Sequence, residues 1–170
     1  AALVPGTVEA CGRRGIKAVV VISGGFREVG PEGAAIEQKM VEIGRRYGMR
    51  IMGPNGIGVI DAYTPINTTF VPGMPPAGHI AFLSQSGALC TAILHWAEAH
   101  HVGFSAVVSL GSGADIDFGD LLDYLAVDPA TRSILLYIEG IRQSRRFLSA
   151  LRVAARLQMG AQWVADRPGG

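Results

Sequence analysis

The hydrophobic residues of the first part of the chain form short runs that alternate with a segment of helical spacing. The run "KAVVVIS", residues 17–23, is apolar at almost every position, which is typical of a strand buried on both faces in a parallel sheet. Residues 7–14 read as the end of a helix that Gly15 stops, and residues 34–48 carry apolar side chains near a period of 3.6. Residues 50–63 predict two short strands joined by a turn.

The alternation becomes more regular in the second part of the chain. It predicts strands at 79–83, 104–109, 133–138 and 160–166, and helices at 87–101, 118–126 and 143–157. Strands separated by helices of this length predict a right-handed, doubly wound parallel sheet. Residues 64–77, between the two parts, hold four of the nine prolines and predict a linker.

Composition and charge narrow the class of protein. Hydrophobic residues make up 49% of the chain and charged residues 17%, which excludes a disordered chain. A net charge of +1 gives no electrostatic case for a nucleic-acid partner or an anionic membrane, and no run of 18 apolar residues predicts a spanning helix. Cys11 and Cys90 stand far apart, without metal-ligand or disulfide spacing, so we expect a cytoplasmic protein.

Small residues gather where the predicted strands end. In a doubly wound sheet, ligands bind beyond the carboxyl ends of the strands, and glycine lets a ligand approach the backbone closely. The segments concerned are 23–26 ("SGGF"), 53–56 ("GPNG"), 84–87 ("SQSG"), 109–113 ("SLGSG") and 139–140 ("EG"). Together they predict one ligand-binding edge of the molecule.

The segment Ser84-Gln85-Ser86-Gly87 allows two interpretations. Ser84 or Ser86 could be an ordinary N-cap that accepts a hydrogen bond from one free N–H group of the helix. Alternatively, the free N–H groups and the positive end of the helix dipole form an anion site. The other small-residue loops at the same edge favour the anion site.

Four motifs carry a resemblance to a known family. The chain contains, in order, "GPNGIGVI", "GHIAFLSQSGALCTAILHWA", "SLGSGADIDFGDLLDYLAVDP" and "ILLYIEGI". Over residues 7–157 it resembles the NDP-forming acyl-CoA synthetases, which include ADP-forming acetyl-CoA synthetase and are related to the succinyl-CoA synthetase α subunit. The resemblance implies an α/β protein. Residues 1–63 would be the C-terminal part of a Rossmann-like CoA-binding domain, 64–77 a linker, and 78–170 an incomplete flavodoxin-like ligase domain.

The same resemblance implies an acid–CoA ligase reaction. Acyl-CoA, ADP and phosphate would be interconverted with acid, CoA and ATP through an acyl phosphate and a phosphohistidine. The implied partners are a CoA thioester, phosphate and an ATP-grasp domain or subunit; CoA serves as cofactor, with ADP or ATP and Mg²⁺ in the complete enzyme. Because an incomplete domain exposes apolar sheet edges, we also expect an oligomer. The acid, and the choice of ADP or GDP, stay open.

The resemblance also assigns roles to residues. The phosphate of the phosphohistidine would be bound by Ser84, Gln85, Ser86 and Gly87. Glu139 would be catalytic, accepting a hydrogen bond from the other nitrogen of that histidine; a strand-end glutamate facing water is the alternative. The CoA site would include Ser23, Gly24, Gly25, Pro54 and Asn55, and Glu28 would line the CoA or substrate pocket. For residues 53–58, a simple bend between two strands is equally compatible with the sequence.

Other titratable residues receive no direct role. Asp115, Asp117 and Asp120 precede or begin a predicted helix, and we expect them to favour its positive end rather than to bind a metal.

None of the histidines matches the family's phosphohistidine, which lies downstream of residue 157. They are His79, His95, His100 and His101. We therefore expect no acyl-CoA-dependent ATP synthesis from the purified chain alone. Two other functions stay open: a non-catalytic CoA-binding or ligand-binding regulatory module of a ligase-like lysine acetyltransferase, and a flavodoxin-like domain for another phosphate ligand.

Overall fold

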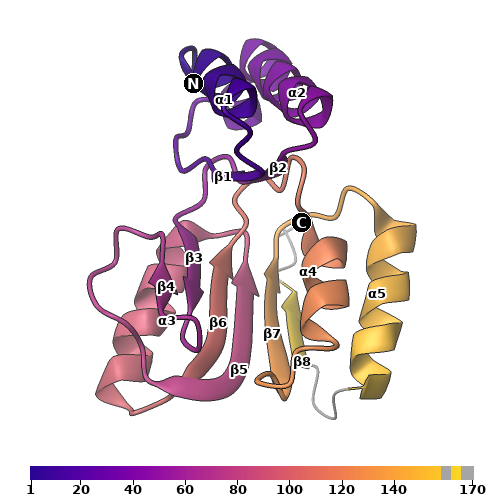
Figure 1. The fold of residues 1–170 in the computed structure, drawn as a ribbon. Helices are drawn as coiled ribbons and strands as arrows, with labels where there is room; N and C mark the ends of the chain where they lie inside the picture. Colours follow the sequence, from indigo (N-terminus) through magenta and orange to yellow (C-terminus); the bar gives the residue numbers. More distant parts are fainter. Residues whose placement is uncertain (158–161, 166–170) are drawn as a thin grey trace.

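The computed structural model describes residues 1–157 and 162–165, which form two lobes (Figure 1). The smaller lobe contains a two-stranded parallel sheet and two helices, and the larger lobe contains a six-stranded sheet with three helices. The elements of the smaller lobe are α1 (Val4–Arg13), β1 (Ala18–Val20), the short 3₁₀ helix η1 (Arg27–Val29), α2 (Pro31–Arg46) and β2 (Arg50–Met52).

In the smaller lobe, α1 and α2 lie on one side of β1 and β2 (Figure 1). Their apolar side chains and those of the strands form one core, which includes Val8, Phe26, Met40 and Ile51. The expectation that residues 17–23 are buried on both faces is wrong: Val20 is 39% exposed and Ile22 49%. The reason is that both helices cover the same face of this narrow sheet.

The larger lobe has the strand order of a flavodoxin-like fold. Its parallel strands are β5 (Ala77–Ser84), β6 (Phe104–Ser109), β7 (Ser133–Ile138) and β8 (Gln162–Ala165), in the spatial order β6-β5-β7-β8. The first strand is thus flanked by the second and third, as in the flavodoxin-like 2-1-3-4 order. The helices that connect these strands are α3 (Gly87–Ala99), α4 (Phe118–Leu125) and α5 (Ser144–Leu157). The predicted fold class is confirmed.

The helices cover both faces of this sheet, which explains why β5 is apolar at successive positions. Ala81 and Leu83 pack into the core that α4 and α5 cover, together with Leu122 and Ala154. Ile80 and Phe82 point to the opposite core, under α3, and contact residues such as Leu94. A strand buried on both faces has no polar positions to alternate with apolar ones.

A short antiparallel pair extends the larger sheet. β3 (Gly58–Asp61) pairs antiparallel with β6, and β4 (Ile66–Asn67) pairs antiparallel with β3. The sequence placed the strand within 58–63 in the first lobe, and that placement is wrong. Ile60 packs under α3, so β3 contributes to the larger core and the sheet is mixed rather than wholly parallel. The segment 64–77 also contains β4; the division into domains stays a prediction.

Ion pairs join β2 of the smaller lobe to the larger lobe. Arg50 Nε donates to Asp115 Oδ2 (3.0 Å), which also accepts from the backbone N–H of Ile51 (2.8 Å). Arg50 Nη2 lies 3.2 Å from Asp120 Oδ1, which Arg146 also contacts. Asp117 and Asp120 form a reciprocal capping box at the start of α4, as the sequence predicted for these two. Asp115 instead faces the smaller lobe.

Two further findings concern membranes and metals. No helix in the described part of the chain has the length and apolar character to cross a membrane. Within residues 1–157 and 162–165, no group of three or more His, Cys, Asp or Glu side chains could hold a metal ion.

The network around Asp120 predicts a defined dependence of stability on pH. Burial by itself raises the pKa of this carboxyl, but the Asp117 N–H, Arg146 and Arg50 lower it more, and the net pKa lies below its ordinary value of 3.8. A group with a lowered folded-state pKa stabilises the fold above its unfolded pKa and loses that effect as pH falls. We expect Asp120→Asn to lower the free energy of unfolding by about 1–3 kcal/mol at pH 7.

The difference between Asp120→Asn and the wild type should shrink as the pH falls below 3.8, because Asp120 then binds a proton in the unfolded chain before it does so in the folded protein. Urea unfolding between pH 7 and pH 3 measures this difference. Glu98→Gln, at an exposed position of α3 outside this network, is the control and should leave stability nearly unchanged. A difference that stays constant over the whole pH range would contradict the assignment.

Candidate functional site

The segment that follows β2 is hydrogen-bonded to both lobes. The N–H of Asn55 donates to the carbonyl of Ser23 in the smaller lobe (3.0 Å). In the other direction, the carbonyl of Pro54 accepts from Ser112 N–H (2.8 Å), and Ile57 N–H donates to Ser109 Oγ (3.0 Å). The segment includes a cis Gly53–Pro54 peptide bond. It does form the bend that the sequence allowed; its role toward CoA stays a prediction.

Gly111 permits the close approach of the two lobes. Its φ is +56°, in the left-handed region, and a Cβ atom there would lie 2.1 Å from the Pro54 carbonyl oxygen. Gly56 has a similar constraint, because its Cβ would lie 2.4 Å from the Ser109 carbonyl oxygen. Gly56 and Gly111 are therefore required by backbone contact between the "GPNG" and "SLGSG" loops.

The two serines at the start of α3 use their hydroxyl groups within the loop. Ser86 is the N-cap: its Oγ accepts from Leu89 N–H (3.3 Å), so the capping interpretation is confirmed. Ser84 is buried, and its Oγ donates to the Ser86 carbonyl and accepts from the Ser86 N–H, both at 3.0 Å. The cap leaves the N–H groups of Gly87 and Ala88, the first two helical residues, directed out of the helix start. Phosphate binding there stays a prediction.

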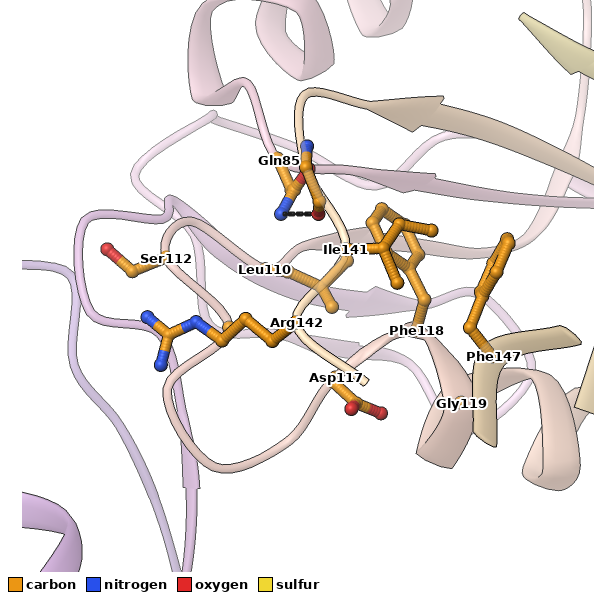
Figure 2. Close-up of a pocket in the computed structure, with 11 residues that line it drawn as sticks. Gln85, Leu110, Ser112, Asp117, Phe118, Gly119, Ile141, Arg142 and Phe147 are labelled. Carbon is orange, nitrogen blue, oxygen red and sulfur yellow. Dashed lines mark hydrogen bonds between the residues drawn. The ribbon is translucent and has the colours of Figure 1, made fainter. Parts of the chain in front are cut away.

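Gln85 fixes the distance between the ends of β5 and β7. Its Oε1 accepts from the N–H groups of Glu139 (2.7 Å) and Gly140 (2.9 Å), and its Nε2 donates to the Gly140 carbonyl (2.9 Å; Figure 2). Strands β5 and β7 are the pair between which a flavodoxin-like sheet reverses its strand order and binds ligands. The Gln85 amide thus holds the Glu139 backbone at this ligand-binding point.

A cavity of about 560 Å³ opens between the lobes at this point. It is lined by Arg27, Glu28, Asn55, Gln85, Gly111, Ser112, Glu139, Gly140, Ile141 and Arg142. It therefore brings together two residues predicted for the CoA or substrate pocket, Glu28 and Asn55, with the predicted phosphate residue Gln85 and the predicted catalytic Glu139.

The other predicted site residues do not line this cavity. They are Ser23, Gly24, Gly25, Pro54, Ser84, Ser86 and Gly87. Several lie directly behind residues that do: a Cβ on Gly24 would lie 3.1 Å from Asn55 Oδ1, and Ser23 accepts the Asn55 N–H. Gly24 and Ser23 thus position Asn55 at the cavity.

Two carboxylates face this cavity and differ in their surroundings. Glu28 Oε1 accepts from the Gly25 N–H (2.6 Å); burial raises the pKa of Glu28, but hydrogen bonds from the N–H groups of Glu28, Gly25 and Phe26 lower it more, so the net pKa is below its ordinary value. Glu139 is exposed, and no hydrogen bond or ion pair to its carboxylate is present among the described residues. The Glu139 carboxylate is therefore available to a ligand or another protein group.

A second, much smaller pocket adjoins the cavity. Its volume is about 20 Å³, which holds roughly one water molecule. Leu110, Phe118, Ile141 and Phe147 form its apolar lining, and Figure 2 shows the guanidinium of Arg142 beside Ser112, away from the two aromatic rings. The loop after β7 is therefore supported on an apolar surface, through its residue Ile141.

The remaining chemically reactive side chains lie away from the cavity. The four histidines do not line it; His79 Nδ1 contacts the Ala130 carbonyl, and His100 stacks on Trp96. Cys90 is buried, and burial raises the pKa of its thiol to about 11, although the neighbouring Ser84 and Ser109 side chains act to lower it. Cys90 is thus a neutral thiol near pH 7 and not a nucleophile.

Sequence reasoning missed three charged residues at this site. Arg27 and Arg142 line the cavity, and both donate to Glu37 Oε1 at 2.8 Å. Glu37 is 1% exposed and lies on the buried stripe of α2 with Met40 and Val41. A charged residue within an apolar stripe was the available signal, because glutamate is almost never fully buried without a partner.

Comparison with known proteins gives matches over most of the chain. Residues 77–159 match the family described as "Succinyl-CoA ligase like flavodoxin domain". The chain is 48% identical over 156 residues to "Acetate--CoA ligase [ADP-forming] I" of Archaeoglobus fulgidus, covering 92% of this chain and 23% of the relative. It is 47% identical over 182 residues to "Acetate--CoA ligase [ADP-forming] I subunit alpha" of Pyrococcus furiosus, covering 99% of this chain and 39% of the relative.

A solved structure matches the fold and the sequence together. It is the dinucleotide-forming acetyl-coenzyme A synthetase 1 of Ca. Korarchaeum cryptofilum in complex with phosphate and ADP. The TM-score is 0.87 at 38% identity, covering 96% of this chain and 35% of that one. The chain thus spans well under half the length of the proteins that it matches.

The contact between Gly111 and Pro54 leads to a prediction with an internal control. Gly111 and Gly113 both have a φ of +56°, but a Cβ on Gly113 would meet only the Ile116 carbonyl at 3.6 Å. We expect Gly113→Ala to lower the free energy of unfolding by about 1–2 kcal/mol, the cost of a left-handed backbone. Gly111→Ala should cost about 1–3 kcal/mol more, because it also forces two backbone segments apart.

Urea unfolding of the two variants and the wild type measures this difference. Equal losses of stability in Gly111→Ala and Gly113→Ala would show that the approach of Pro54 to Gly111 is not a constraint on the fold.

Proposed function

The chain belongs to the family of ADP-forming acyl-CoA ligases, the NDP-forming acyl-CoA synthetases, and we propose that it forms part of the active site of such a ligase. The resemblance that the four sequence motifs carry is confirmed by these relatives. Because the chain spans 23% and 39% of the two curated relatives, the reaction of the whole protein is part of this proposal. That reaction interconverts acyl-CoA, ADP and phosphate with acid, CoA and ATP.

The observation that carries the proposal is the shared cavity of Asn55, Gln85 and Glu139. A ligase of this kind must bring a thioester carbonyl and a phosphate together. The phosphate oxygen attacks the carbonyl carbon, a C–O bond forms, the C–S bond breaks and CoA leaves as the thiolate. The cavity supports this encounter because Asn55 and Gln85 both line it, and Gln85 lies two residues before the first residue of α3, whose N-terminus would stabilise anionic oxygens without proton transfer.

Under this proposal, each predicted site residue has a distinct task. The start of α3, Ser84–Gly87, holds the phosphoryl group, and Asn55 lies toward the thiol end of CoA with Ser23, Gly24, Gly25 and Pro54 behind or beside it. Glu139 accepts a hydrogen bond from a histidine that receives the phosphoryl group and hands it on to ADP. A carboxylate in that position fixes the histidine tautomer and supports its positive charge. Gln85 keeps the Glu139 backbone in place for this contact.

The proposal also covers the partners and cofactors. One relative is named a subunit alpha, and the solved relative holds phosphate and ADP, which supports a partner subunit and a nucleotide. An ATP-grasp domain or subunit, a CoA thioester, and an oligomeric state belong to the proposal. Mg²⁺ would accompany the nucleotide, bound through its phosphates. A cytoplasmic location agrees with the free cysteines Cys11 and Cys90.

A hybrid enzyme tests the proposed function. This chain replaces the matched segment of the Pyrococcus furiosus subunit alpha, and ATP formation from acetyl-CoA, ADP and phosphate is measured together with the partner subunit. We expect turnover by the hybrid, and Glu139→Gln should reduce kcat by about 10²- to 10⁴-fold, because the amide neither fixes the tautomer nor supports the charge.

Glu98→Gln is the control for this experiment. Glu98 is exposed near the C-terminal end of α3, away from the cavity, so its substitution should leave kcat unchanged. A folded hybrid without turnover would refute the proposed function. Full activity in Glu139→Gln would refute the role of that carboxylate alone.

A further inference from the structure

Glu37 is a buried carboxylate with an unusual set of partners. Its Oε1 accepts from Arg27 Nε and Arg142 Nη2, both at 2.8 Å, and only 2% of the side chain is exposed. Its Oε2 is buried and has no hydrogen-bond partner among the described residues. The carboxylate therefore makes all of its polar contacts through one oxygen, to two cations from different parts of the fold.

The contacts of Glu37 link three elements around the cavity. Arg27 begins η1, Glu37 lies on α2, and Arg142 follows β7 in the larger lobe. Both arginines line the cavity of about 560 Å³ between the lobes, and their side chains are 48% and 34% exposed. A guanidinium has five N–H donors, so each arginine keeps donors beyond the one that contacts Glu37.

Stability alone does not account for a carboxylate at this position. Taking a carboxylate out of water is costly, and buried ion pairs are often no more stabilising than apolar side chains of similar volume. Glu37 occupies the buried stripe of α2, where an apolar residue would pack against Met40 and Val41. The feature that only a carboxylate provides is attraction of two guanidinium groups to one point, against their mutual repulsion.

The charges around the cavity indicate which kind of ligand the two arginines would bind. Glu28 and Glu139 also line the cavity, and an anion entering it meets both carboxylates. Arg27 and Arg142 are the cationic side chains that line it, and they offset this repulsion. Paired guanidinium groups match the geometry of carboxylate and phosphate oxygens.

We propose that Glu37 is a positioning residue that holds Arg27 and Arg142 as a binding site for a small oxyanion, the phosphate or the carboxylate of the ligase reaction. The identity of the anion rests on the proposed function; the existence of the site rests on the geometry of the three side chains. Phosphate and carboxylate share the chemistry that a guanidinium pair recognises, and the experiment separates them.

The test measures anion affinity and thermal stability separately on the 170-residue chain. Inorganic phosphate is titrated by ³¹P NMR, and acetate and CoA by calorimetry, with melting temperatures recorded for each variant. Glu37→Gln removes the charge that pairs the arginines and should weaken binding of phosphate or of acetate about tenfold. Arg142→Gln should do the same, and Arg142→Lys should recover only part of the affinity, because lysine keeps the charge but not the planar donors.

Arg50→Gln is the matched control. Arg50 also joins the lobes through ion pairs but does not line the cavity, so its loss should lower the melting temperature and leave the affinity for anions unchanged. If Glu37→Gln does not fold, the two Arg142 variants, at a partly exposed position, carry the test.

Each outcome decides the proposal. A loss confined to phosphate or confined to acetate supports it and identifies the anion. Unchanged affinities with a lowered melting temperature, no anion binding by the wild type, or an effect confined to CoA would overturn it. An active hybrid enzyme with unaltered anion binding in these variants would reject this site alone, whereas an inactive hybrid would reject the proposed function.

Discussion

The close backbone contact between the "GPNG" and "SLGSG" loops is the constraint on which the rest of the site depends. A Cβ at Gly111 or Gly56 would lie within 2.4 Å of a carbonyl oxygen of the other loop, so glycine is required at both positions. Backbone hydrogen bonds then fix the segment between the sheets: the Gly53 and Pro54 carbonyls accept from Ala114 and Ser112 of the larger lobe, and the Asn55 N–H donates to Ser23 of the smaller lobe. Asn55 reaches the cavity because this contact places it there, and the cavity itself exists because the lobes meet at these loops.

Charged side chains at the same interface are divided between two tasks. Arg50, Asp115 and Asp120 lie away from the cavity and make ordinary inter-lobe ion pairs that also involve a helix cap. Arg27 and Arg142 line the cavity, and the buried Glu37 carboxylate that joins them has one oxygen without a partner among the described residues. Both networks resist separation of the lobes, but only the second presents spare donors to the place where a ligand would bind.

Sequence patterns predicted the elements of the larger lobe well, because continuous apolar runs and helix-start residues report local structure. They misplaced the strand of residues 58–61. Its pairing with β6 is decided by residues about 45 to 51 positions further along the chain, and no local signal records that contact. At the site, Asn55, Gln85 and Glu139 were predicted and meet in one cavity. Glu37 was missed because its partners come from elements that the sequence cannot place beside α2.

The site has one part that the larger lobe holds by itself, through the hydrogen bonds of Gln85, and a second part that depends on contact between the two lobes. Gln85 joins the ends of β5 and β7 within the larger lobe, so the start of α3 and the Glu139 backbone keep their spacing whatever the smaller lobe does. Asn55 and Arg27 meet Arg142 around the cavity only while the lobes stay in contact. A change in lobe contact would therefore alter the part of the site that we propose for CoA and the oxyanion, while the part that we propose for the phosphohistidine stays assembled.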